Sequence, residues 1–199
     1  MSAIDPNARI NLSKAHVLLV DGSQHSVDVL AQIMKGFGVA EVQRCTSVDE
    51  AERCVRTKVY DLIVIDPNIS DSAGYGFLNG LRHSGGAANA YTPVILVSGH
   101  ACASDVSRAR DTGANFFVTK PITPNVLLQR ILWVARDKRP FVEVGNYVGP
   151  DRRFKFEGPP DGSDGRRESD LKSPLGNADE PNMSQSEIDT LMKPQRVAI

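Results

Sequence analysis

The sequence predicts an α/β protein with a doubly wound, five-stranded parallel sheet, followed by a largely irregular C-terminal extension. Two observations carry this prediction. Short apolar runs alternate with segments of helical spacing over residues 14–138, and wholly apolar runs are typical of parallel strands that are covered on both faces. Polar or charged residues follow four of the runs directly. Strands that alternate with helices favour a parallel sheet with helices on both sides.

The strands are predicted from runs of apolar or β-branched residues that end at a polar residue or a turn. In chain order they cover residues 17–20, 41–45, 62–65, 93–98 and 115–119. Because each run is short and separated from the next by a helical pattern, we expect every strand to pair in parallel with its neighbours.

Five helices are predicted between and after these strands, at residues 27–37, from 47 onward, 74–83, 104–111 and 124–137. Gly38 and Gly113 end the first and fourth helices, since glycine adopts the left-handed conformation of a helix end. Ser47 and Glu50 form a capping box at the start of the second helix. Thr123-Pro124 is a cap followed by a proline, which opens the last helix.

Four residues with chemical potential lie at the carboxyl ends of predicted strands. Asp21, Asp66, Ser98 and Lys120 each follow or close a strand. Functional residues of doubly wound sheets collect at this edge. Any one of the four is adequately explained as a loop residue or helix cap, but four suitable types at four such positions indicate a common site.

The stretches "VLLVD", "DLIVIDPN", "TPVILVSGHA" and "GANFFVTKPIT" occur in the order found in receiver domains. Over residues 14–138 the chain resembles the CheY-like response regulator receiver, a flavodoxin-like fold. The resemblance implies that Asp66 is the phosphoacceptor and that Ser98 and Lys120 are its phosphate-site partners. It further implies that Phe117 is the switch aromatic and that a cis peptide precedes Pro121.

A carboxylate that attacks a phosphoryl donor needs Mg²⁺ to offset the crowding of negative oxygens. The resemblance implies a metal site made by Asp21, Asp66 and the carbonyl of Asn68. Gly22 stands where the family usually has a second acid, which predicts a weakened site, and Ser70 stands where the family usually has proline. Two interpretations stay open: Asp66 is phosphorylated with weakly bound Mg²⁺, or the receiver is a scaffold that something else switches.

Residues 139–180 form an extension rich in arginine, glycine and proline. "GPDRR" and "SDGRR" form a loose internal repeat in it. Composition alone favours a solvated linker, because the segment buries little apolar surface. Guanidinium groups nevertheless stack on bases, fork onto guanine and pair with phosphates, while carboxylates accept hydrogen bonds from the opposite guanine edge.

This extension resembles the arginine-rich tail of a subgroup of CheY-like proteins that bind cyclic di-GMP. The resemblance implies four main contacts, Arg152, Arg153, Arg166 and Arg167. Further candidate contacts are Tyr147, Asp151, Asp164, Ser169 and Asp170.

The segment 181–199 contains a short amphipathic helix. In "MSQSEIDTLMKP", Ser184 and Glu187 form a capping box and Ile188, Leu191 and Met192 form an apolar stripe. It resembles the CheY-binding peptide of the flagellar motor switch protein. Such a helix would occupy the receiver's own output face, pair with another copy, or imitate the motor; the alternative is an unpartnered turn.

Charge and composition restrict the function class. The 199-residue chain has a formal net charge of -1, which argues against a nucleic-acid binder. We expect no membrane segment, a flexible N-terminus over residues 1–13 and a cytoplasmic location, and we expect no enzyme activity. The sequence thus predicts a single-domain signalling protein that binds cyclic di-GMP and relays the signal by protein contact. The alternative is a conventional phosphoryl-accepting regulator of a histidine-kinase or phosphotransfer pathway, with a passive tail.

Overall fold

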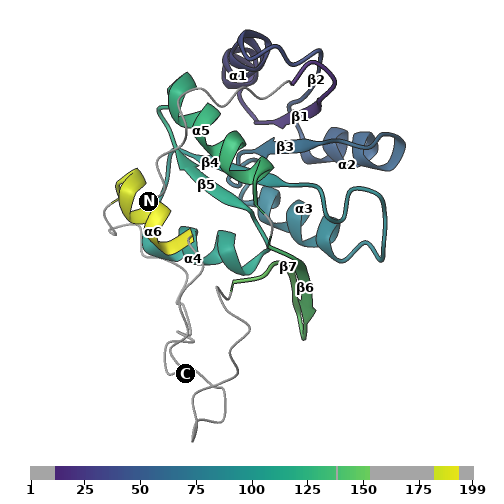
Figure 1. Cartoon of the computed structure of the whole chain (residues 1–199), viewed down its shortest axis with the longest axis vertical. Helices are drawn as coiled ribbons and strands as arrows, with labels where there is room; N and C mark the ends of the chain where they lie inside the picture. Colours follow the sequence, from purple (N-terminus) through teal and green to yellow (C-terminus); the bar gives the residue numbers. More distant parts are fainter. Residues whose placement is uncertain (1–11, 138, 153–181, 193–199) are drawn as a thin grey trace, which may run out of the picture.

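The structure is a computed structural model that describes residues 12–137, 139–152 and 182–192 (Figure 1). Its centre is a five-stranded sheet in the order β2-β1-β3-β4-β5. The strands are β1 His16–Val20, β2 Glu41–Cys45, β3 Leu62–Ile65, β4 Val94–Ser98 and β5 Phe116–Thr119. Each pair of neighbours is parallel, so the predicted doubly wound sheet is confirmed.

Five helices connect or follow the strands, close to the predicted positions. They are α1 Gln24–Gly36, α2 Val48–Thr57, α3 Ala73–Arg82, α4 Ala103–Asp111 and α5 Pro124–Ala135. Ser47 caps α2 by accepting from the Glu50 amide at 3.2 Å, and Gly38 and Gly113 have φ of 84° and 86° after their helices. The peptide between Lys120 and Pro121 is cis, as the resemblance implied.

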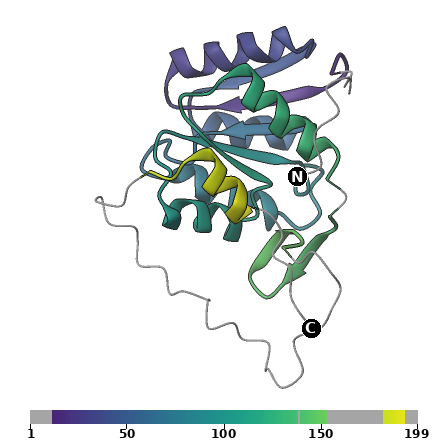
Figure 2. The same cartoon turned by 60° about the vertical axis from the view of Figure 1, so that its left-hand side comes forward.

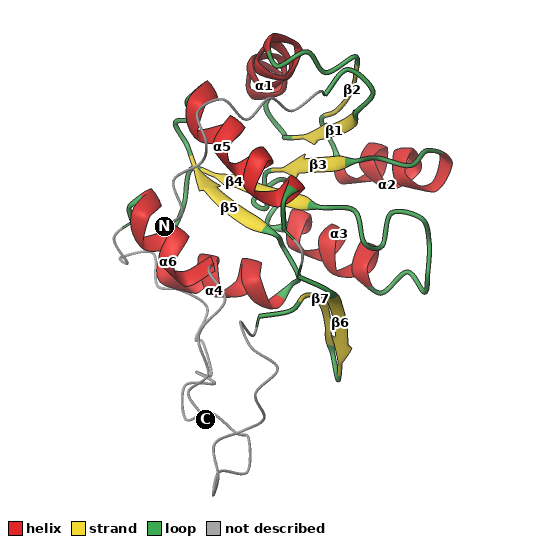
Figure 3. Cartoon of the chain, in the orientation of Figure 1, coloured by secondary structure: helices red, strands yellow, loops and turns green. Residues whose placement is uncertain are grey.

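Helices cover both faces of the sheet (Figure 3). One buried cluster joins α1 and α5 to one face, with Leu30 and Leu127 among its residues. The other cluster joins α2, α3 and α4 to the opposite face, where Phe117 is fully buried. Among the described residues, no helix is long and apolar enough to cross a membrane.

The chain continues after α5 into a hairpin that the sequence analysis did not predict. Its strands are β6 Phe141–Val144 and β7 Tyr147–Pro150, paired antiparallel. Val144 lies opposite Tyr147, so two residues form the loop, and the first of them, Gly145, has a φ of 59°. The start of the extension is therefore regular rather than irregular, and the part of the predicted tail beyond Arg152 lies outside the described residues up to position 181.

The hairpin packs against the turn between α4 and β5. A Cβ on Gly113 would lie 2.3 Å from the Val148 carbonyl oxygen, and one on Gly149 would lie 2.7 Å from the Gly113 Cα. Only glycine allows two backbones to approach so closely. Arg82 lies buried beneath this contact, with its guanidinium 4.9 Å from the centre of the Phe141 ring.

A last helix, α6 Gln185–Met192, lies beside α4 and β5 (Figure 2). Its capping box forms as predicted: the Ser184 amide donates to the Glu187 carboxylate at 2.7 Å, and the Glu187 amide donates to the Ser184 hydroxyl at 3.4 Å. Ile188 and Met192 join the buried cluster of Phe117. Of the placements left open for this segment, the structure thus shows the receiver's own surface.

Candidate functional site

Three charged side chains from three strand ends meet at the carboxyl edge of the sheet. Asp21 follows β1, Asp66 follows β3 and Lys120 follows β5. The Lys120 Nζ lies 2.7 Å from Asp21 Oδ2 and 2.6 Å from Asp66 Oδ2. The structure therefore brings these predicted site residues together, with one cation between two carboxylates.

The backbone explains why these side chains converge. The Asp66 amide donates to the Val20 carbonyl at 2.9 Å, and the Lys120 amide donates to the Ser98 carbonyl at 2.8 Å, so strand pairing continues just past the strand ends. Gly74 in the first turn of α3 approaches the same backbone, since a Cβ there would lie 2.6 Å from the Asp66 carbonyl oxygen. Asp66 is thereby held by the end of β1 and by the start of α3.

Ser98 and Asn68 complete the polar surroundings of Asp66. The Asn68 amide nitrogen donates to Asp66 Oδ1 at 2.8 Å, and its side-chain Nδ2 donates to the Ser98 hydroxyl at 2.8 Å. The His100 amide also donates to that hydroxyl, at 3.0 Å. Ser98 is fully buried, so its hydroxyl is fixed in place beside Asp66.

Lys120 stays charged in this setting. Partial burial would lower the pKa of its ammonium, but hydrogen bonds to Asp21 and Asp66 outweigh burial, and the net pKa is raised above the ordinary value. The charged ammonium of Lys120 reduces the repulsion between the two carboxylates. It also supplies positive charge where a phosphoryl group on Asp66 would lie.

Two of the predicted Mg²⁺ ligands, Asp21 and Asp66, lie together at this site. Asp21, Asp66 and the Asn68 carbonyl are three hard oxygen donors, and Mg²⁺ in proteins commonly uses one or two carboxylates and keeps several waters. Among the described residues no cluster holds three or more His, Cys, Asp or Glu side chains in metal-binding positions. The Asn68 carbonyl as a third ligand, and the weakening of the site by Gly22, stay predictions.

The comparisons with known proteins agree with this geometry. Residues 17–132 match the family described as the response regulator receiver domain, which is more than half of the chain. The chain belongs to this family. The receiver is also similar to the cell cycle response regulator CtrA of Brucella ovis, with 36% identity over 77 residues, which is 39% of this chain and 32% of that protein. The chain thus matches about a third of the length of its curated relatives.

Solved structures show the same receiver fold. The chemotaxis response regulator CheY4 of Vibrio cholerae is 23% identical, with a TM-score of 0.55 over 60% of this chain and 98% of that one. A putative response regulator from Chloroflexus aurantiacus J-10-fl is 25% identical, with a TM-score of 0.56 over 62% of this chain and all of the other. Neither match covers the whole of this chain.

The loop after Asp66 is unusual in its backbone. Ser70, Asp71 and Ser72 have φ values of 45°, 57° and 72°, a run of three left-handed residues without a glycine. Each such residue costs about 1–3 kcal/mol unless its surroundings compensate. Proline has φ fixed near -65° and cannot adopt this geometry. A serine at position 70, where the resemblance implies that proline is usual, is compatible with the φ of 45° in this loop after Asp66.

Phe117, the predicted switch aromatic, lies in the middle of β5 and is fully buried. It belongs to the cluster that also holds Ile188 and Met192 of α6. The side chain is thus placed between the sheet and the C-terminal helix. Its role as a switch stays a prediction.

The candidate ligand-binding residues fall into two groups. Tyr147, Asp151 and Arg152 lie at the end of the hairpin, where the Arg152 guanidinium lies 3.9 Å from the centre of the Tyr147 ring and pairs with Asp111. Tyr147 also donates its hydroxyl to the Pro150 carbonyl at 2.7 Å. The other six lie outside the described residues: Arg153, Asp164, Arg166, Arg167, Ser169 and Asp170.

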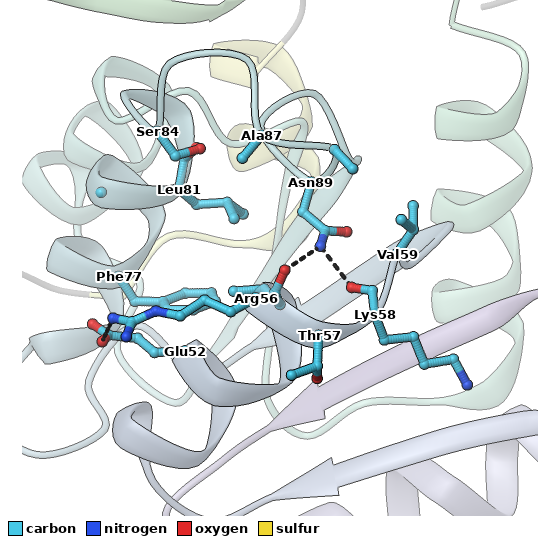
Figure 4. Close-up of a pocket in the computed structure, with 13 residues that line it drawn as sticks. Glu52, Arg56, Thr57, Lys58, Val59, Phe77, Leu81, Ser84, Ala87 and Asn89 are labelled. Carbon is cyan, nitrogen blue, oxygen red and sulfur yellow. Dashed lines mark hydrogen bonds and ion pairs between the residues drawn. The ribbon is translucent and has the colours of Figure 1, made fainter.

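A cavity of about 520 Å³ opens between α2, α3 and the segment before β4, away from Asp66 (Figure 4). Asn89 lines it and is already satisfied: its Nδ2 donates to the Val55 and Lys58 carbonyls at 2.7 Å each, and its Oδ1 accepts from the Tyr60 amide at 2.9 Å. These bonds hold the loop in place. None of the residues predicted for function lines this cavity.

Sequence reasoning missed several residues that the structure shows to be engaged. Gln185, Asp189 and Arg130 connect α6 to the receiver, and Arg82 is buried under the hairpin. Gln185 and Asp189 lie inside the peptide that the resemblance had singled out, so a signal was available for them. Arg82 gave none, because its burial depends on a hairpin far away in the sequence.

Proposed function

We propose that this receiver accepts a phosphoryl group on Asp66 from a histidine kinase or phosphotransfer protein. We further propose that it relays the signal by protein–protein contact and has no enzyme activity of its own. The observation that carries the proposal is the position of Lys120, whose ammonium lies within 2.7 Å of both Asp21 and Asp66. This arrangement supplies an acceptor carboxylate together with the charge that an acyl phosphate requires.

In the proposed reaction, an Asp66 carboxylate oxygen attacks the phosphorus of a phosphohistidine. The new P–O bond forms while the P–N bond breaks, and the departing imidazole nitrogen takes the electron pair. Lys120 compensates the added charge. The Ser98 hydroxyl, which accepts from Asn68 and His100, has its own hydrogen available for a phosphoryl oxygen.

Asp21, Asp66 and the Asn68 carbonyl would hold Mg²⁺ at this site. When bound, the ion supplies positive charge that offsets the negative oxygens of the acceptor and of the phosphoryl group. Without a second acid at Gly22, we expect the bound ion to be held weakly. The protein itself holds the two carboxylates in place through their ion pairs with Lys120.

Phosphorylation is tested with acetyl phosphate and Mg²⁺ on the full chain, with the phosphorylated fraction measured by intact-protein mass spectrometry. We expect a mass increase of one phosphoryl group in wild type and none in Asp66→Asn, a nearly isosteric control that removes the nucleophile together with its negative charge. Equal behaviour of the two proteins would rule out Asp66 as the acceptor and favour the scaffold interpretation.

The weakness of the metal site is tested by restoring the missing acid. A Cβ on Gly22 would lie 3.5 Å from Ile69 Cγ1, an ordinary contact, so a side chain fits there. Gly22→Asp should bind Mg²⁺ about tenfold more tightly, which corresponds to ~1.4 kcal/mol. Gly22→Asn has the same size without the charge and should gain less. The measurement is calorimetric titration with Mg²⁺.

We also propose that the extension binds cyclic di-GMP. Support comes from Arg152, which stacks on Tyr147 and adjoins both Asp151 and Arg153. A guanidinium placed over an aromatic ring offers a stacking surface for a guanine base, and its sequence neighbours supply charge and a hydrogen-bond acceptor. The packed hairpin would give this surface a fixed position on the receiver.

Calorimetry with cyclic di-GMP on the full chain tests this second function. Replacing Arg152, Arg153, Arg166 and Arg167 together by alanine should weaken binding more than tenfold, because each charge-assisted contact contributes about 1.5–3 kcal/mol. A charge-matched control replaces four exposed arginines outside the motif, Arg53, Arg56, Arg108 and Arg136, and should bind like wild type. If the fourfold variant bound cyclic di-GMP as tightly as wild type, the extension would be a linker and not a ligand-binding segment.

The resemblance of the terminal peptide suggests the destination of the signal. As part of the proposal, the receiver acts in the cytoplasm and its target is the flagellar motor switch protein or related machinery. Neither nucleic acid nor membrane is a partner in it. Co-purification of the motor switch protein with the full chain, with and without acetyl phosphate, tests this part separately.

A further inference from the structure

Helix α6 contacts the edge of the sheet at β5. Strand β5 is the last in the sheet, so its outer backbone groups have no neighbouring strand. The Gln185 side chain takes that place: its Oε1 accepts from the Thr119 amide at 2.9 Å, and its Nε2 donates to the Phe117 carbonyl at 3.0 Å. One amide thus pairs with both exposed backbone groups of the edge.

Apolar contacts continue along the same face of the helix. Ile188 is fully buried and Met192 is 4% exposed. Both belong to the cluster that contains Phe117, Ala101 and Val106. Because these side chains lie one turn apart on α6, a single helical face fills the space between α4 and β5.

A charged contact adds specificity. Asp189 pairs with Arg130 of α5, and both side chains are nearly buried, at 9% and 11% exposure. The Arg130 guanidinium lies 4.9 Å from the centre of the Phe116 ring, and Gln185 Nε2 also donates to the Asp189 carboxylate at 2.8 Å. A helix without an acid at this position would leave Arg130 buried and without a counter-ion, which is strongly unfavourable.

The residues before α6 fix its starting point. The Met183 amide donates to the Ala101 carbonyl at 2.8 Å, and the Ala101 amide donates to Asn182 Oδ1 at 3.0 Å. This pair of bonds joins the peptide to the loop between β4 and α4. The contacts therefore extend over the whole described segment, residues 182–192.

We propose that the surface formed by Ala101, Phe117, Thr119 and Arg130, here named the α6 site, is a recognition site for a helix, and that α6 fills it as an intramolecular ligand. The pattern that the site recognises is an amide, an apolar residue three positions later with an acid next to it, and a second apolar residue one turn further on. A partner helix with this pattern binds only by displacing α6. This inference goes beyond the proposed function, because it requires neither phosphorylation nor a nucleotide.

The size of the helix makes displacement feasible. Eight residues form about two turns, and a helix this short is marginal without its docking contacts. Its attachment to the receiver makes docking intramolecular, and effective concentrations in such cases are on the order of mM. A free peptide with an intrinsic dissociation constant near 0.1 mM would therefore bind about tenfold more weakly while α6 is docked.

The experiment uses a fluorescent peptide with the sequence of residues 182–192, titrated into the full chain and followed by anisotropy. Ile188→Glu in the chain should release α6 and strengthen peptide binding about tenfold relative to wild type. The control Thr190→Glu changes an exposed residue whose hydroxyl bonds only within α6, and it should bind like wild type. Gln185→Ala is a second release variant that introduces no buried charge.

Several outcomes would overturn the proposal. One is equal peptide affinity for wild type and both release variants; another is a peptide carrying Ile188→Glu that binds as well as the parent. A dimer of the wild-type chain that the peptide dissociates, seen by light scattering, would show that α6 fills the site of a second copy instead. Circular dichroism of each variant establishes that the receiver itself is folded.

Discussion

The described residues of the C-terminal extension contact the receiver in two places, and the two attachments differ in kind. The hairpin β6–β7 meets the end of α4 through backbone, where Gly113 and Gly149 leave no room for a side chain. Helix α6 meets the start of α4 and the edge of β5 through side chains, led by Gln185 and Ile188. Where two glycines bring backbones into contact, the position of the hairpin can change little. Side-chain contacts, as at α6, are the kind that peptide ligands commonly make.

The difference suggests which attachment belongs to the folded body and which is exchangeable. The Phe141 ring of the hairpin lies against the guanidinium of Arg82, which is buried. Helix α6 also covers a nearly buried arginine, Arg130, but the counter-ion of Arg130 is Asp189 of the helix itself. We therefore expect changes at the hairpin to lower the stability of the whole receiver, and changes at α6 to release the helix alone.

The largest expected effect is at Arg82. Its guanidinium donates to the Gly113, Ala90 and Thr92 carbonyls at 3.1, 2.7 and 2.8 Å, and burial lowers its pKa to about 10. Arg82→Leu leaves these buried acceptors without a donor and should lower the free energy of unfolding by about 3–5 kcal/mol. Urea denaturation followed by circular dichroism measures this loss.

The control for this prediction is Arg108→Ala. Arg108 is exposed, and its guanidinium lies 4.2 Å from the centre of the Tyr75 ring, so its loss should cost no more than ~1 kcal/mol. If Arg82→Leu were as mild as this control, the buried hydrogen bonds of Arg82 would not stabilise the receiver, and the prediction would be wrong.

A second prediction isolates the backbone contact itself. Gly113→Ala and Gly38→Ala introduce the same strain, because both glycines have nearly equal positive φ, 86° and 84°. Only at Gly113 does the added Cβ meet an atom, the Val148 carbonyl oxygen. We expect the Gly113 variant to lose about 1–3 kcal/mol more stability than the Gly38 variant. Thermal unfolding of the pair measures the difference, and equal losses would argue against hairpin docking.

The third prediction concerns α6, where the expected loss in the free energy of unfolding has an upper limit. Ile188→Ala removes a fully buried side chain, which in a core costs about 2–5 kcal/mol. Here the loss is limited by the free energy of docking, since the helix can leave without unfolding the receiver. We expect the unfolding midpoint of Ile188→Ala to match that of a chain ending at residue 181. Hydrogen exchange should show α6 amides opening more often than those of β7.

A midpoint for Ile188→Ala well below that of the shortened chain would contradict this view. It would mean that the helix and the sheet unfold as one unit. Wild-type protein at matched concentration is the reference, because a helix exchanged between copies would make the midpoint depend on concentration.

The sequence predicted the part of the molecule that rests on local patterns. Strands and helices of the receiver followed from apolar runs and caps such as Ser47, and strand ends brought Asp66 and Lys120 together as expected. These signals work because parallel strands covered on both faces have a distinctive composition.

What the sequence did not predict depends on contacts between distant segments. The hairpin was missed although Gly145-Asn146 between β-branched and aromatic residues is a hairpin signal, because the proline and glycine around it suggested an irregular tail. The site of α6 was left open among several alternatives, since the pattern of the helix shows which face is apolar but not what covers it. Burial of Arg82 was unpredictable for the same reason.

The smallest expected effect separates packing from charge at the hairpin. Arg152 at its end pairs with Asp111 of α4, but Asp111 is 57% exposed, and exposed ion pairs contribute about 0.2–1 kcal/mol. Asp111→Asn should therefore lower stability by no more than this amount, and the difference from wild type should vanish at high salt. A loss above ~2 kcal/mol would mean that the ion pair, rather than the glycine contact, holds the hairpin.

The same variant, Asp111→Asn, frees Arg152 from its carboxylate partner and leaves the contact of Arg152 with the Tyr147 ring unchanged. If cyclic di-GMP uses that guanidinium, its affinity should rise slightly in Asp111→Asn, because the ligand no longer competes with a neighbouring acid.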